Sequence, residues 1–194
     1  MAKQRWKPGN MLYPLPAVMV SCQRKGERPN IITVAWAGTI CSDPVMLSIS
    51  VRKERYSHAI IRETGEFVVN LVTKELAYAT DFCGVRSGRD VDKFKEMGLT
   101  PLAMQRVNAP GIAQSPLNIE CIVTEVKELG SHDMFLAKAV GVTADEKYMD
   151  DTGKFCLNQA GLITYSHGEY FELGKKVGKF GYSVKKKGNR KKGK

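Results

Sequence analysis

The chain has 194 residues, of which 43% are hydrophobic and 26% charged. This is typical of one soluble globular domain, and no apolar run approaches the ~20 residues of a membrane-spanning helix. Ten of the 30 Lys and Arg residues, and no acidic residue, lie between Gly174 and the C-terminus, so the formal net charge of +10 belongs to that end. Such a run is typical of a solvated tail, and without interleaved aromatic residues it does not indicate specific nucleic-acid recognition.

The cysteines are scattered and form no C-x-x-C pair, so neither a zinc ribbon nor a dithiol redox motif is predicted. Free thiols in a reducing cytoplasm are expected. The basic start, "MAKQRWKPGN", lacks the apolar segment of a signal peptide. No linker divides the chain, so we expect one domain over residues 1–183, followed by a basic, disordered tail over residues 184–194.

Strand-like runs dominate the sequence. Apolar or alternating stretches predict strands at residues 15–23, 30–38, 45–51, 66–72, 118–129 and 134–144. Gly26 and Pro29 lie between the first two runs and predict a hairpin connection.

Three short segments have helical signals. The first covers residues 57–65, with Ser57 as the N-cap and Gly65 at the end. The second covers residues 73–84, from Thr73 as cap to Gly84, and the third covers residues 90–98 with Asp90 as cap. Closely spaced strands with a few small helices favour an antiparallel barrel over alternating βαβ units.

The run that begins at Asn30 has two unequal faces. Alternation gives a bulky face of Ile32, Val34 and Trp36, and a small face of Thr33, Ala35 and Ala37. Two explanations stay open for the small face. Another element of the protein packs closely against it, or a flat ligand lies there.

Familiar catalytic motifs are absent: the sequence has no G-x-S-x-G, H-E-x-x-H, Walker A or G-x-G-x-x-G pattern. Its three histidines are far apart, so a histidine-rich metal site is not expected. If the protein is an enzyme, a bound organic cofactor is expected to supply the chemistry.

A cluster of basic residues precedes the first predicted helix. Arg52, Lys53 and Arg55 stand just ahead of Ser57. Unpaired N–H groups and the dipole at a helix start favour a phosphate there. A solvated basic turn with a serine that merely caps the helix is the alternative.

Two motifs at a fixed spacing indicate a family. "N-x-x-T-x-A-W-A-G" within "NIITVAWAGTICSDPVMLSISVRKERYSHAII" is followed by "R-x-S-x-x-I". Further matching stretches are "TGEFVVNLVT", "ATDFCGVRSGRDVDKF", "LNIECIVTEV", "GSHDMFLAKAV" and "YFELGKKVGKFGYS". From about Pro14 to Ser183 the chain resembles the flavin reductase-like proteins with an FMN-binding split barrel, in particular those of the flavoredoxin type.

The resemblance implies a mainly β fold: an antiparallel, Greek-key split β-barrel with a few short peripheral helices. It also implies a homodimer that binds FMN noncovalently near its interface. The composition and motifs described above add the expectation of a cytoplasmic protein with no metal, no membrane and no specific nucleic acid as partner. The residues at the matching cofactor-binding positions are Asn30, Thr33, Ala35, Trp36, Cys41, Ser42, Arg52, Arg55, Ser57, His58, Lys93 and Phe94.

Within this set the resemblance implies distinct roles. Asn30, Thr33, Ala35 and Trp36 would line the flavin, with Cys41 and Ser42 beside its ring; Arg52, Arg55, Ser57 and His58 would surround the phosphate; and Lys93 and Phe94 would close the pocket. His132 would face the nicotinamide side as a catalytic residue.

Three of these residues have a second interpretation. Trp36 points at the core by alternation, so its backbone alone would touch the flavin. His132 also suits an exposed turn. Cys41 is either a redox-active thiol or a small packing residue.

The predicted function is an NAD(P)H-dependent flavin or ferric reductase that passes electrons through bound FMN, an oxidoreductase. The alternative is a flavoredoxin-type electron carrier with a protein partner and no direct NAD(P)H oxidation. The electron acceptor stays open among free flavin, a ferric chelate and a redox protein. A third hypothesis makes the basic tail a module that binds acidic polymers.

Overall fold

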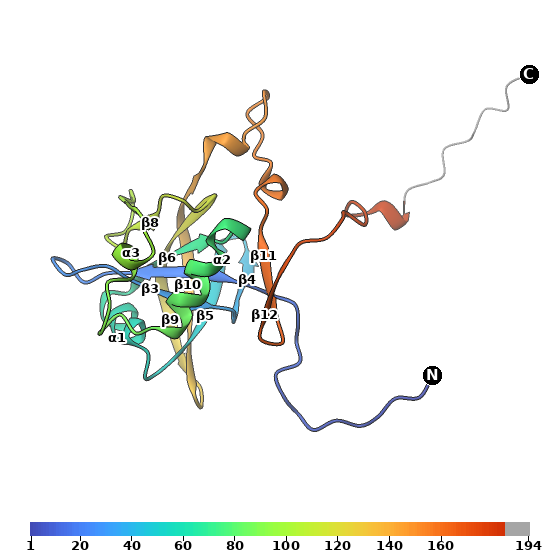
Figure 1. Ribbon diagram of the computed structural model, residues 1–194, viewed down its shortest axis with the longest axis horizontal. Coiled ribbons are helices and arrows are strands. Elements are labelled where there is room, and N and C mark those ends of the chain that lie inside the picture. The colour runs from blue at the N-terminus through green and yellow to red at the C-terminus, as the bar shows by residue number, and fades with distance from the viewer. Residues whose placement is uncertain (185–194) are drawn as a thin grey trace, which may run out of the picture.

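The computed structural model describes residues 1–184 (Figure 1). A seven-stranded, fully antiparallel sheet forms the body, with the strand order β3-β2-β6-β9-β10-β5-β4. Its strands are β2 (Val18–Cys22), β3 (Asn30–Val34), β4 (Ala37–Ser42), β5 (Val45–Arg52), β6 (Glu66–Leu71), β9 (Leu117–Glu128) and β10 (His132–Ala144). Strands are therefore found in all the predicted ranges, but residues 15–23 and 30–38 are each divided between two strands.

The two edge strands of this sheet follow each other in the chain. β3 ends at Val34 and β4 begins at Ala37, so only the bend at Ala35 and Trp36 joins them. Because so short a connection joins opposite edges, the sheet must curl until these edges come together, which gives the predicted split barrel. The backbone N–H of Ser50, on β5, donates to the carbonyl of Trp36 at 2.9 Å and extends the β4–β5 pairing into the bend.

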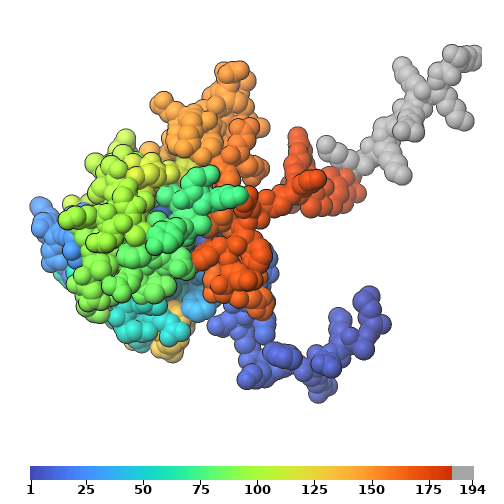
Figure 2. All heavy atoms as spheres, in the orientation of Figure 1, coloured from blue at the N-terminus to red at the C-terminus, as the bar shows by residue number. Residues whose placement is uncertain are grey.

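Smaller elements surround the barrel. The helices are α1 (Tyr56–Thr64), α2 (Ala77–Val85) and α3 (Lys93–Glu96), with short 3₁₀ turns at Lys74–Leu76, Glu146–Tyr148, Leu157–Gln159 and Tyr182–Val184. A second sheet joins β1 (Leu15–Pro16), β11 (Ile163–Ser166) and β12 (Glu169–Glu172), and β7 (Pro101–Leu102) pairs with β8 (Gly111–Ile112). The N-terminal segment and the segment after β12 project away from the body (Figure 2).

Two apolar cores lie on opposite faces of β2 and β3. Ile32 faces the barrel interior, where it joins Ile49, Phe67 and other side chains that are fully buried. Ile31 faces the other way, into a core that includes Phe94. Helices α2 and α3 cover this second core, and Figure 1 shows them in front of the sheet. β3 is therefore fixed on both of its faces.

The helix boundaries correct three sequence predictions. Ser57 is the second residue of α1 and does not cap it, because its Oγ accepts a hydrogen bond from Asn30 and the N-cap position belongs to Arg55. Gly84 lies inside α2, which continues to Val85. Asp92 caps α3 in place of Asp90, since its carboxylate accepts from the backbone N–H of Lys95. Gly65, by contrast, ends α1 in the left-handed conformation as predicted.

Among residues 1–184, no helix is long and apolar enough to cross a membrane. The predicted tail, residues 184–194, lies outside the described residues except for Val184.

Candidate functional site

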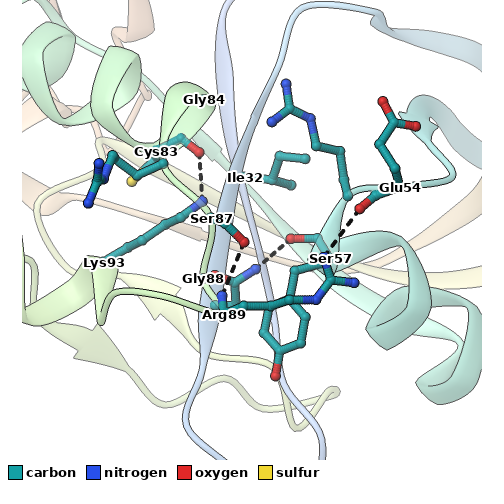
Figure 3. A pocket seen from close by; sticks show the side chains of 13 residues that line it. Ile32, Glu54, Ser57, Cys83, Gly84, Ser87, Gly88, Arg89 and Lys93 are labelled. Carbon is teal, nitrogen blue, oxygen red and sulfur yellow. Dashed lines mark hydrogen bonds between the residues drawn. The ribbon is translucent and has the colours of Figure 1, made fainter.

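A continuous groove runs along β3 between the start of α1 and the end of α2. It has two parts that share Ile32, Arg55 and Gly84. We call the part near α1 the basic pocket, lined by Asn30, Ile32, Glu54, Arg55, Tyr56, Ser57, Cys83, Gly84, Arg86, Ser87, Gly88, Arg89 and Lys93 (Figure 3).

The basic pocket has an excess of positive charge. Arg55, Arg86, Arg89 and Lys93 line it, against the single carboxylate of Glu54. The guanidinium of Arg89 lies over the ring of Tyr56 at 5.4 Å from its centroid, which ties the loop after α2 to the first turn of α1. The pocket therefore suits a phosphate, as the sequence predicts for the start of this helix.

Asn30 stands at the floor of this pocket. Its Nδ2 donates to the Oγ of Ser57 at 2.7 Å, while its buried Oδ1 has no hydrogen-bond partner among the described residues. A Cβ on Gly88 would lie 1.9 Å from that Oδ1, so no side chain fits at position 88. Buried acceptors are normally satisfied, so this oxygen is an exception, and the backbone of Gly88 covers it.

Lys93 links two elements beside the same pocket. Its Nζ donates to the carbonyl of Ile31 at 2.6 Å and to that of Cys83 at 2.7 Å, the latter drawn in Figure 3. An ammonium group has three donors, so one remains for a ligand. Burial lowers the pKa of Lys93 to about 8, and the charge of Arg55 contributes to this shift. Lys93 is therefore mostly protonated at neutral pH but loses its proton within a short range above it.

The second part of the groove, which we call the aromatic pocket, is wider. Its lining is Asn10, Tyr13, Ala17, Ile32, Thr33, Val34, Ala35, Trp36, Ser50, Val51, Arg52, Arg55, Asp81, Gly84, Val85, His132, Tyr165, Gly168 and Tyr170. The rings of Trp36 and His132 meet edge to face, with centroids 4.6 Å apart. Burial lowers the pKa of His132, and the nearby Arg52 guanidinium lowers it further. His132 is therefore held as a neutral imidazole near pH 7.

Tyrosines form the opposite wall of the aromatic pocket. Tyr13 comes from the N-terminal segment, and Tyr165 and Tyr170 come from the β11–β12 hairpin. The hydroxyl of Tyr170 donates to Asp81 Oδ1 at 3.4 Å, and burial, followed by the charge of Asp81, raises the pKa of Tyr170 to about 12. This phenol therefore stays neutral, and the pocket presents flat rings on both sides.

Most of the predicted site residues come together in the groove. Asn30, Arg55, Ser57 and Lys93 line the basic pocket, and Thr33, Ala35, Trp36, Arg52, Arg55 and His132 line the aromatic pocket. Trp36 is 39% exposed and does not point into the core, because the strand bends at Ala35 and the alternation ends there.

Four predicted residues lie elsewhere. Cys41 and Ser42 are on β4 and line neither pocket, and the thiol of Cys41 donates to the carbonyl of Asp43 at 3.3 Å. Phe94 is 4% exposed and packs in the second core. His58 lies behind the groove, with its Nε2 2.8 Å from a carboxylate oxygen of Asp133. These positions follow from packing between segments that one sequence does not show.

Both explanations that the sequence left open for the small face, close packing by another element and room for a flat ligand, apply to different parts of it. The hydroxyl of Thr33 donates to the carbonyl of Thr80 on α2. A Cβ on Gly84 would lie 3.2 Å from the Cβ of Thr33, so the helix packs closely here. Ala35 follows the end of β3, is only half-buried, and lines the aromatic pocket. A flat ligand therefore has room at Ala35 but not over the whole face.

Sequence reasoning missed the loop after α2 and the tyrosine wall. Arg86, Ser87, Gly88 and Arg89 follow one another in "GVRSGRD", a basic, glycine-containing loop at a helix end, which is a usable signal for an anion site. The tyrosines had no such local signal, because the β11–β12 hairpin is brought to the groove by contacts with segments far away in the chain, among them β1 and the residues before α2. Among the described residues, no group of three or more His, Cys, Asp or Glu side chains is placed to hold a metal ion.

Comparison with known proteins gives one consistent result. Residues 11–174 match the flavin reductase like domain. The structure is similar to the flavoredoxin of Desulfovibrio vulgaris (Miyazaki F), with a TM-score of 0.87 and 30% sequence identity over 95% of this chain and 100% of that one. It is also similar to a flavoredoxin from Methanosarcina acetivorans, with a TM-score of 0.83 and 26% identity over 95% of this chain and 100% of that one. An FMN-binding protein from Thermus thermophilus shares the fold, with a TM-score of 0.74 and 23% identity over 89% of this chain and 96% of that one.

Proposed function

The chain belongs to the flavin reductase-like family, and on that premise we propose that it is a flavoprotein that binds FMN noncovalently and passes electrons through it. The observation that carries this proposal is the continuity of the groove. One end is basic and suits a phosphate, and the other is lined by flat rings, so a single ligand with a phosphate and a planar ring system matches both ends.

The residues of the groove suit FMN in particular. Arg55 and the loop Arg86–Arg89 supply charged donors for the phosphate, and the third donor of Lys93 adds to them. Ala35 and Trp36 offer a flat, half-buried surface to the ring. When bound, FMN would supply the ability to accept and donate electrons, and the residues of this chain would bind and orient it.

The more specific role that we propose is that of a flavoredoxin-type electron carrier. The likeness to two flavoredoxins over nearly the whole chain supports it. The absence of a dinucleotide-binding fingerprint from the sequence agrees with a protein partner as the electron donor. Trp36 stands half-exposed at the aromatic end, where such a partner would meet the flavin.

An NAD(P)H-dependent flavin or ferric reductase is the second candidate, and His132 favours it. The imidazole is neutral, lies against Trp36, and lines both the aromatic pocket and an adjacent hollow that includes Ser131 and Arg52. A nicotinamide placed in that hollow would lie beside the flavin ring.

We further propose that the protein acts as a homodimer. Ile40 on β4 is 45% exposed and Val45 on β5 is 54% exposed, which leaves apolar side chains on one edge of the barrel open to a second copy. Sedimentation equilibrium at several protein concentrations tests this, and a monomer at every concentration would contradict it.

The experiment that separates the two functions is anaerobic reduction of the FMN-loaded protein, followed by visible absorbance. A carrier keeps its oxidised spectrum after NADH or NADPH is added, yet dithionite bleaches it and a redox protein such as a cytochrome restores it. A reductase bleaches at a catalytic rate with one of the two nucleotides. A protein that takes up no FMN at all would contradict both candidates.

A further inference from the structure

A buried carboxylate lies behind the basic pocket, outside the groove. Asp133 is on β10, next to His132, and is completely buried. Its Oδ2 lies 2.8 Å from His58 Nε2 and 3.2 Å from a guanidinium nitrogen of Arg62, both on α1. Its Oδ1 has no hydrogen-bond donor among the described residues, only the ammonium of Lys53 at 3.3 Å as an ion pair. One carboxylate thus joins β10, α1 and the turn before α1.

The turn before α1, residues 52–55, determines the direction in which its basic side chains point. The backbone N–H of Arg55 donates to the carbonyl of Arg52 at 3.1 Å, which closes the turn. Lys53 points to Asp133, away from the groove, while Arg52 lines the aromatic pocket and Arg55 lines both pockets. The ion pair between Lys53 and Asp133 therefore fixes which face of the turn the two arginines present to a ligand.

The first turn of α1 is held in the same way. His58 follows Ser57 directly, and its backbone N–H donates to the carbonyl of Arg55 at 3.0 Å. Its ring packs edge to face on Phe135 of β10, with centroids 5.4 Å apart, and reaches Asp133 from there. Burial raises the pKa of Asp133, but the hydrogen bond from His58 and the nearby ammonium of Lys53 outweigh it and lower that pKa, so the carboxylate stays charged.

We propose that Asp133 is a positioning residue of the cofactor site: through His58 and Lys53 it sets the start of α1 so that Arg55 and Ser57 face the phosphate of the ligand. The proposal rests on the proposed function, since it takes FMN as that ligand. It also gives His58 a role different from the one expected from the sequence, because the histidine supports the phosphate site from behind and does not touch the phosphate.

A simple charge effect would act in the opposite direction. Removal of the Asp133 charge leaves the ammonium of Lys53 without this partner, while Arg62 keeps Glu128 at 2.7 Å. By Coulomb attraction alone, the uncompensated charge of Lys53 would tighten the binding of a phosphate dianion. If Arg55 and Ser57 lose their positions, in contrast, FMN binds more weakly. Whether the dissociation constant of FMN falls or rises therefore distinguishes the charge effect from the positioning effect.

The test compares the dissociation constants of FMN and riboflavin, which differ only by the phosphate, through quenching of flavin fluorescence. For Asp133→Asn we expect the constant for FMN to rise about tenfold, a loss of about 1.4 kcal/mol, while that for riboflavin stays within about twofold of the wild-type value. His58→Phe, which keeps the aromatic contact with Phe135 but has no donor for Asp133, should raise the constant for FMN in the same way. His58→Gln, whose amide can donate to Asp133, should restore most of the affinity.

Glu120→Gln is the matched control, because Glu120 is another buried carboxylate, 2% exposed, that accepts from the backbone of Arg106 and Val107 far from the groove. We expect it to lower the thermal midpoint without changing the ratio of the two constants. Equal weakening of both ligands by Asp133→Asn, unchanged or tighter FMN binding, or equal effects of His58→Gln and His58→Phe would overturn the positioning role. Failure of the wild-type protein to bind FMN would instead overturn the proposed function, and this inference with it.

Discussion

The two ends of the groove are built in different ways. In the basic pocket, polar groups hold one another: Asn30 donates to Ser57, and Lys93 donates to two carbonyls. In the aromatic pocket, the contacts are mostly between rings, and Trp36 and Tyr170 come from distant parts of the chain. Hydrogen bonds fix direction as well as distance, whereas ring contacts tolerate small shifts.

This difference suggests that the basic end determines the affinity for FMN and that the aromatic end determines electron exchange. A rigid, charged pocket can recognise the phosphate of a ligand and supply most of the binding free energy. A pocket of packed rings with exposed edges can admit a second molecule without breaking hydrogen bonds. We therefore expect substitutions at the basic end to change how tightly FMN binds, and substitutions at the aromatic end to change how it exchanges electrons.

The largest effect on binding is expected for Gly88→Val. The Cβ alone would lie 1.9 Å from Asn30 Oδ1, so either the loop or the amide must move. We expect the dissociation constant for FMN to rise by about 100-fold or more, a loss of about 2.7 kcal/mol. Titration calorimetry measures it, and Gly174→Val is the control, because nothing lies within 4 Å of the added Cβ and Gly174 lines no part of the groove. Near-normal affinity for FMN in Gly88→Val would show that the loop after α2 is not part of the FMN site.

Arg55→Ala should come next, because Arg55 is exposed to both pockets and can make charge-assisted hydrogen bonds of about 1.5–3 kcal/mol. FMN affinity should fall about tenfold or more, while riboflavin affinity changes little. Comparison of the two flavins by fluorescence quenching tests this. Equal losses for both flavins would show that Arg55 acts on the ring and not on the phosphate.

A smaller, pH-dependent effect is expected from Lys93. As pH rises through about 8, the ammonium loses its proton and its charge, and FMN affinity should fall about fivefold, since a charge at ~4 Å is worth about 1 kcal/mol in water. The phosphate is already a dianion there, because its second pKa is about 6. Affinity measured from pH 7 to pH 10 tests the effect, and Lys93→Met should abolish the pH dependence.

The stability of the ligand-free protein should change with pH in the other direction. The pKa of Lys93 is about 8 in the fold and 10.5 in its ordinary state, so between these values the unfolded chain binds more protons. The contribution of Lys93 to the free energy of unfolding therefore rises from about pH 8 to about pH 10.5. Urea unfolding of wild type and Lys93→Met at both ends of this range isolates the contribution as the difference between the two proteins. An identical pH dependence in both would contradict the lowered pKa.

The smallest effect on binding is expected for Trp36→Leu, which removes a half-exposed ring at the aromatic end. FMN affinity should stay within about twofold of wild type. The rate at which a redox partner reoxidises the reduced protein should change, as stopped-flow absorbance would show. A large loss of affinity with an unchanged rate would reverse the division of roles between the two ends.

The sequence predicted the barrel and the basic end better than the aromatic end, for physical reasons. Strand periodicity is local, and Arg55 and Ser57 are two residues apart, so their grouping could be inferred from spacing. Asn30 was predicted only through the family resemblance, because it lies 27 residues before its partner Ser57. The tyrosine wall depends on the pairing of β11 with β1, which are almost 150 residues apart, as Leu15 pairs with Tyr165. The position of His58 was misjudged because its partner, Asp133, arrives from a strand far along the chain.

The bend at Ala35 and Trp36 links the pocket to the dynamics of the whole barrel. The same two residues line the aromatic pocket and join the edge strands, and the amide of Ser50 on β5 holds the carbonyl of Trp36 at the start of the β4–β5 pairing. Any separation of β5 from this bend must therefore deform the pocket, and a ligand bound there must oppose that separation. The exchange of the Ser50 amide with deuterium should slow when FMN binds, so a single backbone proton would report both on occupancy and on the breathing of the barrel.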